Sequence, residues 1–186
     1  GDVVADHPLV DLDGGLWIDR ENRKLVGVRV DGMKPEIYYF DTDYAKLQAT
    51  LNASFPGQEV SYQLRGKRAV VFTRGDNNVG KAYLYDTERK VLEALYTAKP
   101  ELEGKTLSTQ TVINYAARDG LNIPAYLTLP EGTPAKGLPL VAYIHGGPHA
   151  RDSFGYDPTT QMLASRGYAV LQPQFRMSTG FGWKHH

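Results

Sequence analysis

Short apolar runs separated by polar turns recur along the first part of the chain. The runs are rich in β-branched and aromatic residues, and pairs such as Asp31-Gly32 between them favour chain reversal. Runs of this length and spacing are typical of antiparallel sheet in a sandwich, a barrel or propeller blades. The later runs favour a single propeller blade, which has roughly four strands. The predicted strands cover residues 16–19, 24–30, 36–40, 60–64, 69–73, 82–86 and 91–95.

A helix interrupts the strands after the third run. Tyr44, Leu47 and Leu51 recur at the i, i+3 and i+7 spacing that places side chains on one helical face. Thr42 or Asp43 has a side chain of the kind that caps a helix N-terminus. We therefore expect one face of this helix to be apolar, and a Pro-Gly pair to end it.

Two further expectations concern the predicted blade. Residues 69–73 are apolar throughout, so we expect this strand to be buried on both faces. The following loop carries Asp76, Asn77 and Asn78, which are residue types that bind calcium. The ligand spacing of an EF-hand is absent, so we expect an ordinary turn and no metal site.

The pattern changes after a charged linker at 100–105, which contains Pro and Gly. Two strands flank the turn signal Asp119-Gly120 and predict a hairpin. Two more strands enclose a helix that Asp157 would cap, with Pro158 in its first turn. A strand–helix–strand order predicts a right-handed parallel crossover. These elements are strands at 111–115, 125–129, 140–144 and 168–173 and a helix at 157–167.

Composition narrows the classes of function. Twenty-one basic residues balance 21 acidic ones, so the basic excess that nucleic acid or an anionic membrane requires is missing. No apolar run approaches the roughly 20 residues that a membrane-spanning helix needs. The lack of cysteine excludes disulfides and thiol chemistry, and leaves open whether the parent protein works in the cytoplasm or the periplasm. We expect no cofactor, no nucleic-acid partner and no membrane partner.

The most informative motif is His145-Gly146-Gly147-Pro148, directly after the apolar run at 140–144. Two glycines after a buried strand let the backbone turn tightly and approach a ligand closely. In α/β-hydrolases the loop after the third strand supplies one backbone N–H of the oxyanion hole, often from an H-G-G motif. The motif therefore indicates acyl-transfer chemistry.

A nucleophile elbow of the form G-x-S-x-G is absent from the sequence. The nearest match is Ser178, where Arg176 replaces the first glycine. We therefore expect a fragment of a larger enzyme, truncated before the nucleophile and inactive alone. Arg176 could bind a substrate carboxylate, although an ion pair is the favoured interpretation. His149 could face the substrate cleft.

Five motifs in the second half of the chain together resemble one protein family. They are A-R-D-G at 117–120, I-P-A-Y-L-T-L-P at 123–130, H-G-G-P at 145–148, L-A-S-R-G-Y-A-V at 163–170 and F-R-M-S-T-G-F-G at 175–182. In this order and spacing they resemble the prolyl oligopeptidase family of serine peptidases, and most closely its acylaminoacyl-peptidase-like branch. The resemblance is sharp over about residues 110–183 and looser before residue 100. It implies β-propeller blades of antiparallel β structure over 1–106, followed by the N-terminal part of an α/β-hydrolase domain over 107–186.

The resemblance also implies roles for individual residues. The second glycine of the motif, Gly147, would offer its backbone N–H to the oxyanion, with His145, Gly146 and Pro148 supporting the loop. The triad serine, aspartate and histidine would lie further along the parent chain. The substrate would be a short peptide, and a homo-oligomer could form through the hydrolase domain. Met177 stands where the family usually has the glycine of Arg-Gly-Ser, so the local turn could differ.

Two other classes of function remain open. An esterase or lipase could use an H-G-G loop for similar chemistry without a propeller, but the β-rich residues 1–100 argue against it. A non-catalytic propeller-type binding module could use the strands and an incomplete hydrolase sheet as an interaction surface. A G-x-S-x-G motif in the parent sequence would discriminate the enzymes from the binding module.

Overall fold

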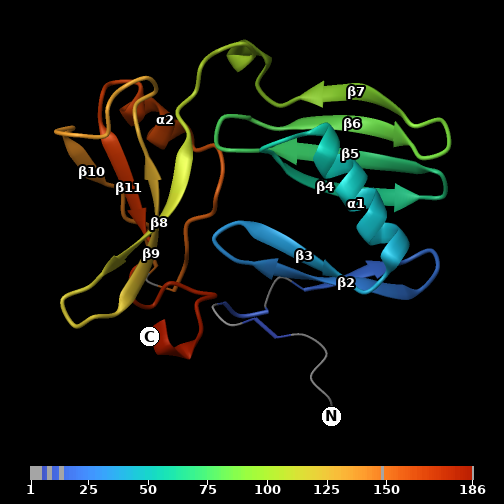
Figure 1. Cartoon of the computed structure of the whole chain (residues 1–186), viewed down its shortest axis with the longest axis horizontal. Helices are drawn as coiled ribbons and strands as arrows, with labels where there is room; N and C mark the ends of the chain where they lie inside the picture. Colours follow the sequence, from blue (N-terminus) through green and yellow to red (C-terminus); the bar gives the residue numbers. More distant parts are fainter. Residues whose placement is uncertain (1–5, 8–9, 13–14, 148, 186) are drawn as a thin grey trace.

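The structure is a computed structural model that describes residues 6–7, 10–12, 15–147 and 149–185. These residues form three sheets, which are mostly antiparallel and are accompanied by few helices (Figure 1). Each predicted strand of the first half is present, with its ends shifted by a few residues. None of the described helices is long and apolar enough to cross a membrane.

The first sheet contains β1 (Leu16–Asp19), β2 (Lys24–Asp31) and β3 (Pro35–Tyr39) in that order, all antiparallel. Its central strand brings Gly27 against β3 so closely that a Cβ atom there would lie 2.6 Å from the Tyr38 carbonyl oxygen. A glycine at this point therefore permits the register in which Gly27 pairs with Tyr39.

The helix α1 (Thr42–Ser54) follows the first sheet and covers the second (Figure 1). Its N-cap is Asp41, so the prediction of Thr42 or Asp43 was wrong by one or two residues. Asp41 has extended backbone angles, and its carboxylate accepts the N–H groups of Asp43 and Tyr44. The predicted apolar face is confirmed, because Leu51 is buried and Tyr44 and Leu47 pack against the same core.

The second sheet has the order β4-β5-β6-β7 and is antiparallel throughout. Its core face carries Tyr62, Ala69 and Val71. The prediction that the strand at 69–73, now β5, is buried on both faces was wrong. Phe72 is 45% exposed on the face opposite the core. An antiparallel sheet can keep one face in solvent, and apolar residues on that face do not make it a core. The bounds are β4 (Glu59–Arg65), β5 (Arg68–Arg74), β6 (Lys81–Asp86) and β7 (Val91–Thr97).

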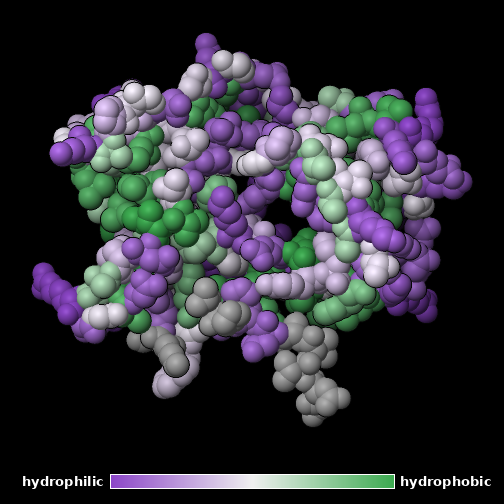
Figure 2. Space-filling model, viewed as in Figure 1, coloured by the Kyte–Doolittle hydropathy of each residue, from purple (hydrophilic) through white to green (hydrophobic). Residues whose placement is uncertain are grey.

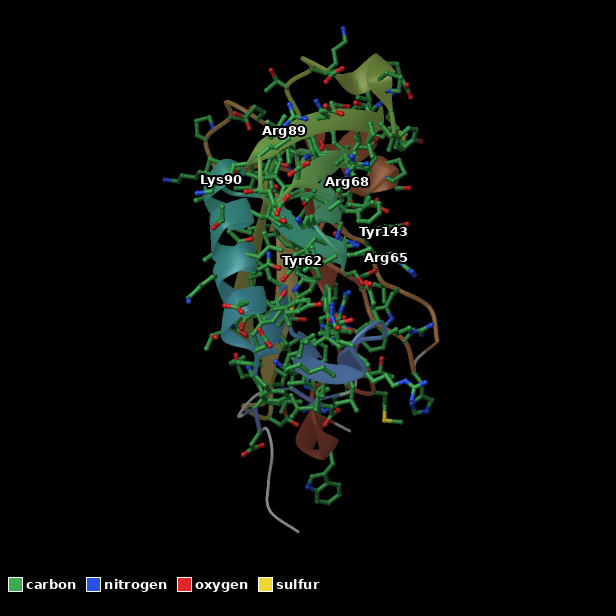
Figure 3. The ribbon with its side chains drawn as sticks, turned by 90° about the vertical axis from the view of Figure 1, so that its right-hand side faces the viewer. Tyr62, Arg65, Arg68, Arg89, Lys90 and Tyr143 are labelled. Atoms are coloured by element: carbon green, nitrogen blue, oxygen red, sulfur yellow. The ribbon has the colours of Figure 1, made fainter. Side chains whose placement is uncertain are left out.

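One end of the second sheet is basic. Arg65 and Arg68 flank the β4–β5 turn, and Arg89 and Lys90 lie in the β6–β7 turn (Figure 3). With Lys67 of the first turn, which pairs with Glu88 of the second, five cations lie where these two hairpins reverse. Tyr62 lies further in, where its hydroxyl donates to the Tyr44 carbonyl of α1 over 2.9 Å. The charged turns thus face solvent while the aromatic residue holds the helix to the sheet.

The third sheet has the order β10-β11-β9-β8. The predicted hairpin is confirmed as β8 and β9, and β10 pairs in parallel with β11 across α2, as the strand–helix–strand pattern predicts. Asp157 caps α2 as expected. The bounds are β8 (Gln110–Ala116), β9 (Asn122–Thr128), β10 (Leu140–Ala142), α2 (Pro158–Ala164) and β11 (Ala169–Pro173). Two short 3-10 helices, η1 (Pro100–Leu102) and η2 (Trp183–His185), lie outside the sheets.

Hydrogen bonds join the third sheet to the second. The Asp76 carboxylate accepts the backbone N–H of Gln110 over 2.6 Å, and the Asp76 carbonyl accepts from the side chain of Gln161 over 3.1 Å. Asp76 lies in a bend, as predicted, and it also anchors the start of β8. Apolar side chains gather over the third sheet in Figure 2, on the face turned toward the viewer.

Candidate active site

The loop that follows β10 leaves the sheet at a fixed point. Tyr143 donates its N–H to the Leu171 carbonyl over 2.8 Å, which extends the parallel pairing one residue beyond β10. The strand is therefore shorter than the predicted 140–144, and Ile144 and His145 already belong to the loop. Residues 143–157 form the loop in which the sequence predicts an oxyanion donor, and we name it the oxyanion loop after that prediction. It starts at the carboxyl end of a parallel strand, which is where α/β sheets bind ligands.

His145 anchors the start of this loop through three contacts. Its ring stacks on Phe175 with the ring centroids 4.3 Å apart. Its Nδ1 lies 2.8 Å from the Gly146 carbonyl oxygen and its Nε2 lies 2.9 Å from Ser178 Oγ. Because a carbonyl only accepts, the neutral tautomer that fits both contacts has its proton on Nδ1 and accepts the hydrogen of the Ser178 hydroxyl at Nε2. His145 therefore braces the loop.

Ser178 is 0% exposed, so no substrate reaches its hydroxyl. The preceding residue, Met177, has φ +73°, a left-handed conformation that glycine adopts most easily. The turn thus keeps a conformation suited to glycine although methionine occupies the position. The Met177 N–H donates to the His185 carbonyl over 3.1 Å, which secures the turn.

Gly147 has a backbone conformation that side chains rarely adopt, with φ +135°. A Cβ atom there would lie 2.8 Å from the backbone nitrogen of His149 and 3.1 Å from that of Ala150. Gly147 is exposed, and within the described part of the chain no acceptor takes its N–H. The loop therefore requires glycine here and leaves this donor available. Gly146 is exposed beside it, and Pro148 lies outside the described residues.

The far side of the loop is held by a buried glutamine. Gln174 is 0% exposed, and its amide donates to the Asp152 carbonyl over 2.7 Å and accepts the Asp152 N–H over 3.1 Å. This two-point bond fixes the backbone of Asp152 as a strand partner would. Burial raises the pKa of the Asp152 carboxyl, against the opposing influence of His145 and a hydrogen bond from Gln172. One Asp152 oxygen, Oδ2, is buried with no partner among the described residues.

The other predicted residues have plain roles. Arg176 forms an ion pair with Asp119, so the favoured interpretation of Arg176 is confirmed. His149 lies exposed on the loop. No cluster of three or more His, Asp or Glu residues within the described ranges could hold a metal ion.

Sequence reasoning missed Gln174 and Arg151 as residues that hold the loop. Gln174 comes directly after β11, and a polar side chain just beyond a buried strand was the available signal. Arg151 donates to carbonyls at the β2–β3 turn, 119 and 120 residues away in sequence, and no local signal marks such a contact.

A wide groove of the described chain lies elsewhere. It encloses about 870 Å³ between the first and second sheets and is lined by residues from 29 to 98, including Lys34, Glu36, Glu59 and Arg74. None of these lining residues comes from the oxyanion loop. The groove is therefore a space between neighbouring sheets, and the exposed N–H of Gly147 marks the candidate site.

Comparison with known proteins relates the chain to peptidases. Dipeptidyl aminopeptidase BIII from Pseudoxanthomonas mexicana is 38% identical over 190 residues, which are 97% of this chain and 27% of that protein. The acylamino-acid-releasing enzyme of Sus scrofa is 39% identical over 74 residues, which are 39% of this chain and 10% of that enzyme. No family model matches the sequence.

Solved structures agree on the fold. A puromycin-hydrolyzing peptidase of Mycobacterium tuberculosis superposes with a TM-score of 0.60 at 23% identity, over 86% of this chain and 25% of that one. Prolyl oligopeptidase B from Galerina marginata gives a TM-score of 0.59 at 19% identity, over 86% and 24%. The curated relatives that match most of this chain are about four times as long, because the match covers 27% and 26% of them.

These matches show the chain to be a homologue of peptidases. Dipeptidyl aminopeptidases and acylamino-acid-releasing enzymes are among its homologues, and its fold is similar to that of a prolyl oligopeptidase, in agreement with the resemblance of the motifs.

Proposed function

We propose that the parent protein is a serine peptidase that cleaves short peptides by Ser-His-Asp acyl transfer. In this proposal residues 1–106 form the end of a β-propeller and residues 107–186 form the start of an α/β-hydrolase domain. The observation that carries it is the free N–H of Gly147, which lies in a loop whose conformation requires glycine and which follows a parallel strand. The peptidase homologues favour this reading over an esterase or a binding module.

The chemistry follows from where charge develops. Attack on a peptide carbonyl places a negative charge on its oxygen, and the Gly147 N–H would donate to that oxyanion. The second donor and the triad would come from the parent chain beyond residue 186. A rigid loop matters because an N–H donor stabilises the oxyanion most when it is already in place and the loop does not have to rearrange during the reaction. The His145 and Gln174 contacts supply that rigidity on the two sides of Gly147.

The N–H of Gly147 can be removed in the full-length parent by replacing the 146–147 amide with an ester. Proline is a poor substitute here, because its φ near −65° is incompatible with the observed +135°. The ester should lower kcat by roughly two to three orders of magnitude. KM should change little, because the oxyanion forms only in the transition state.

A matched control is the same ester at Gly137, in the exposed loop before β10, which should leave kcat unchanged. Fluorophosphonate provides the second readout. It should label one serine of the parent, beyond residue 186, and leave the 186-residue chain unlabelled. Normal kcat in the Gly147 ester, or a parent that neither cleaves peptides nor reacts with the probe, would contradict the proposal.

A further inference from the structure

Carbonyl groups at the turn between β2 and β3 accept hydrogen bonds from the third sheet and its loops. The two terminal nitrogens of Arg151 bind the Asp31 and Gly32 carbonyls over 2.7 and 2.9 Å. The Tyr126 hydroxyl binds the next carbonyl, of Met33, over 2.7 Å. Burial raises the pKa of Tyr126 to about 12, so this hydroxyl stays protonated and donates. Three successive carbonyls, from the end of β2 into the β2–β3 turn, therefore accept hydrogen bonds from these two residues.

The Arg151 guanidinium is held in one orientation. Its centre lies 4.4 Å from the centroid of the Phe181 ring, and Nη1 also lies 3.4 Å from the Thr179 carbonyl oxygen. A planar fork can meet two adjacent carbonyls at once, whereas the ammonium of lysine is a single point charge. The geometry thus suits arginine and couples two separate backbone segments.

Arg151 differs from Tyr126 in its place along the chain. Tyr126 lies in β9, whereas Arg151 belongs to the oxyanion loop, four residues after Gly147. Its neighbours on both sides are fixed, since the Ala150 carbonyl accepts the Thr179 N–H over 3.0 Å and Gln174 clamps Asp152. With so little slack in the chain, a displacement of the β2–β3 turn would move the loop that carries Gly147.

We propose that Arg151 is a positioning residue that couples the β2–β3 turn of the first sheet to the oxyanion loop. The Gly147 N–H is then aligned for catalysis only while the first sheet is docked on the third. This inference rests on the proposed function of Gly147 and adds to it the way in which the preceding region controls the site.

The experiment, in the full-length parent, removes hydrogen bonds to the β2–β3 turn in two ways, by substituting Arg151 or by substituting Tyr126. Arg151→Met keeps an apolar stem on Phe181 but removes both donors, and Arg151→Lys keeps the charge without the fork. Both should lower kcat by roughly ten- to a hundredfold, because a displacement of about 1 Å at a reacting group costs this much. KM should stay within about threefold, as expected when transition-state stabilisation alone is lost.

Tyr126→Phe is the matched control, because it frees the Met33 carbonyl but keeps the ring beside Phe154 and leaves both Arg151 donors in place. It should lower the melting temperature about as much as Arg151→Lys and leave kcat near normal. A peptide aldehyde, whose adduct carries an oxyanion, should bind the Arg151 variants more weakly by the same factor as kcat falls. The affinity for a product peptide should stay the same. A purely structural role for Arg151 would not separate these two affinities.

Three results would overturn the inference. The first is near-normal kcat in a folded Arg151→Met or Arg151→Lys protein. The second is a Tyr126→Phe variant that loses as much kcat as the Arg151 variants, which would assign the effect to the turn as a whole. The third is an equal loss of affinity for aldehyde and product. A wild-type parent that is inactive and unlabelled by fluorophosphonate would instead refute the proposed function itself.

Discussion

The Nε2 atom of His145 lies 2.9 Å from the Oγ atom of Ser178, a separation at which a histidine could activate a serine. This serine has no exposed surface, and the ring of its partner is stacked on Phe175. A nucleophile must be reached by its substrate, so the pair cannot perform the first step of acyl transfer in this conformation. It joins the start of the oxyanion loop to the turn after β11.

Removal of this hydroxyl should therefore weaken the fold. Ser178→Ala leaves the Nε2 acceptor of His145 without its donor, which should cost about 1–3 kcal/mol of unfolding free energy. Urea unfolding followed by circular dichroism measures the change. Ser165→Ala is the control, because the exposed Ser165 hydroxyl bonds to the Met162 carbonyl within its own helical turn. If fluorophosphonate labelling of the parent disappears in Ser178→Ala, Ser178 is a nucleophile after all.

Asp152 should make stability fall as the pH rises. Burial raises its pKa in the folded chain, so the folded state binds more protons than the unfolded state between the ordinary and the raised pKa. The penalty is absent at lower pH and fully present above the raised value. Asp152→Asn should therefore melt at the same or a higher temperature than the wild type at pH 7, with the difference vanishing near about pH 4.

Asp119 provides the control of opposite sign. A backbone hydrogen bond from Leu121 and the pairing with Arg176 lower the pKa of Asp119, so its contribution is present at neutral pH and lost as the pH falls. Asp119→Asn should be less stable than the wild type at pH 7 and equal to it in acid. If the melting temperatures of Asp152→Asn and Asp119→Asn, each relative to the wild type, changed with pH in the same direction between acid and pH 7, the opposite signs assigned to the two carboxyls would be contradicted.

Gly27 should resist even the smallest side chain. Its added Cβ atom would lie 2.6 Å from a carbonyl of the neighbouring strand, so β2 and β3 would have to separate. We expect Gly27→Ala to lower the unfolding free energy by about 1–3 kcal/mol, the usual cost of forcing extra volume into packed structure. Gly75→Ala is a suitable comparison, because the nearest atoms there lie at an ordinary 3.8 Å. Equal effects of the two substitutions would show that the close approach does not exist in solution.

The outer edge of the third sheet should make the isolated 186-residue chain associate. Among the described strands β10 pairs only with β11, and beside it Leu140 and Ile144 are 58% and 54% exposed. An unpaired apolar edge favours pairing with another chain. Size-exclusion chromatography should show concentration-dependent oligomers that Ile144→Lys reduces. A monodisperse monomer with a sharp melting transition would mean that the chain is self-sufficient.

Local signals were enough to predict most elements of the fold. The hairpin around Asp119-Gly120 and the capped helix after Asp157 depend on residues a few positions apart, and both are present. Two of the errors, the capping residue Asp41 and the one-sided burial at Phe72, have different causes. Asp41, Thr42 and Asp43 all have side chains that can cap a helix, and the backbone angles decide which of them does so. The exposure of a strand face depends on what packs on the sheet.

The sequence by itself determined the strands, their turns and the His-Gly-Gly motif, because these depend on the spacing of side chains and on glycine conformations within a few residues. Only the tertiary structure decided what holds Gly147 in place. His145 meets Ser178 across 33 positions, and Arg151 meets the Asp31 carbonyl across 120. Backbone carbonyls are identical in every residue, so no pattern of side chains marks which of them a distant arginine will bind.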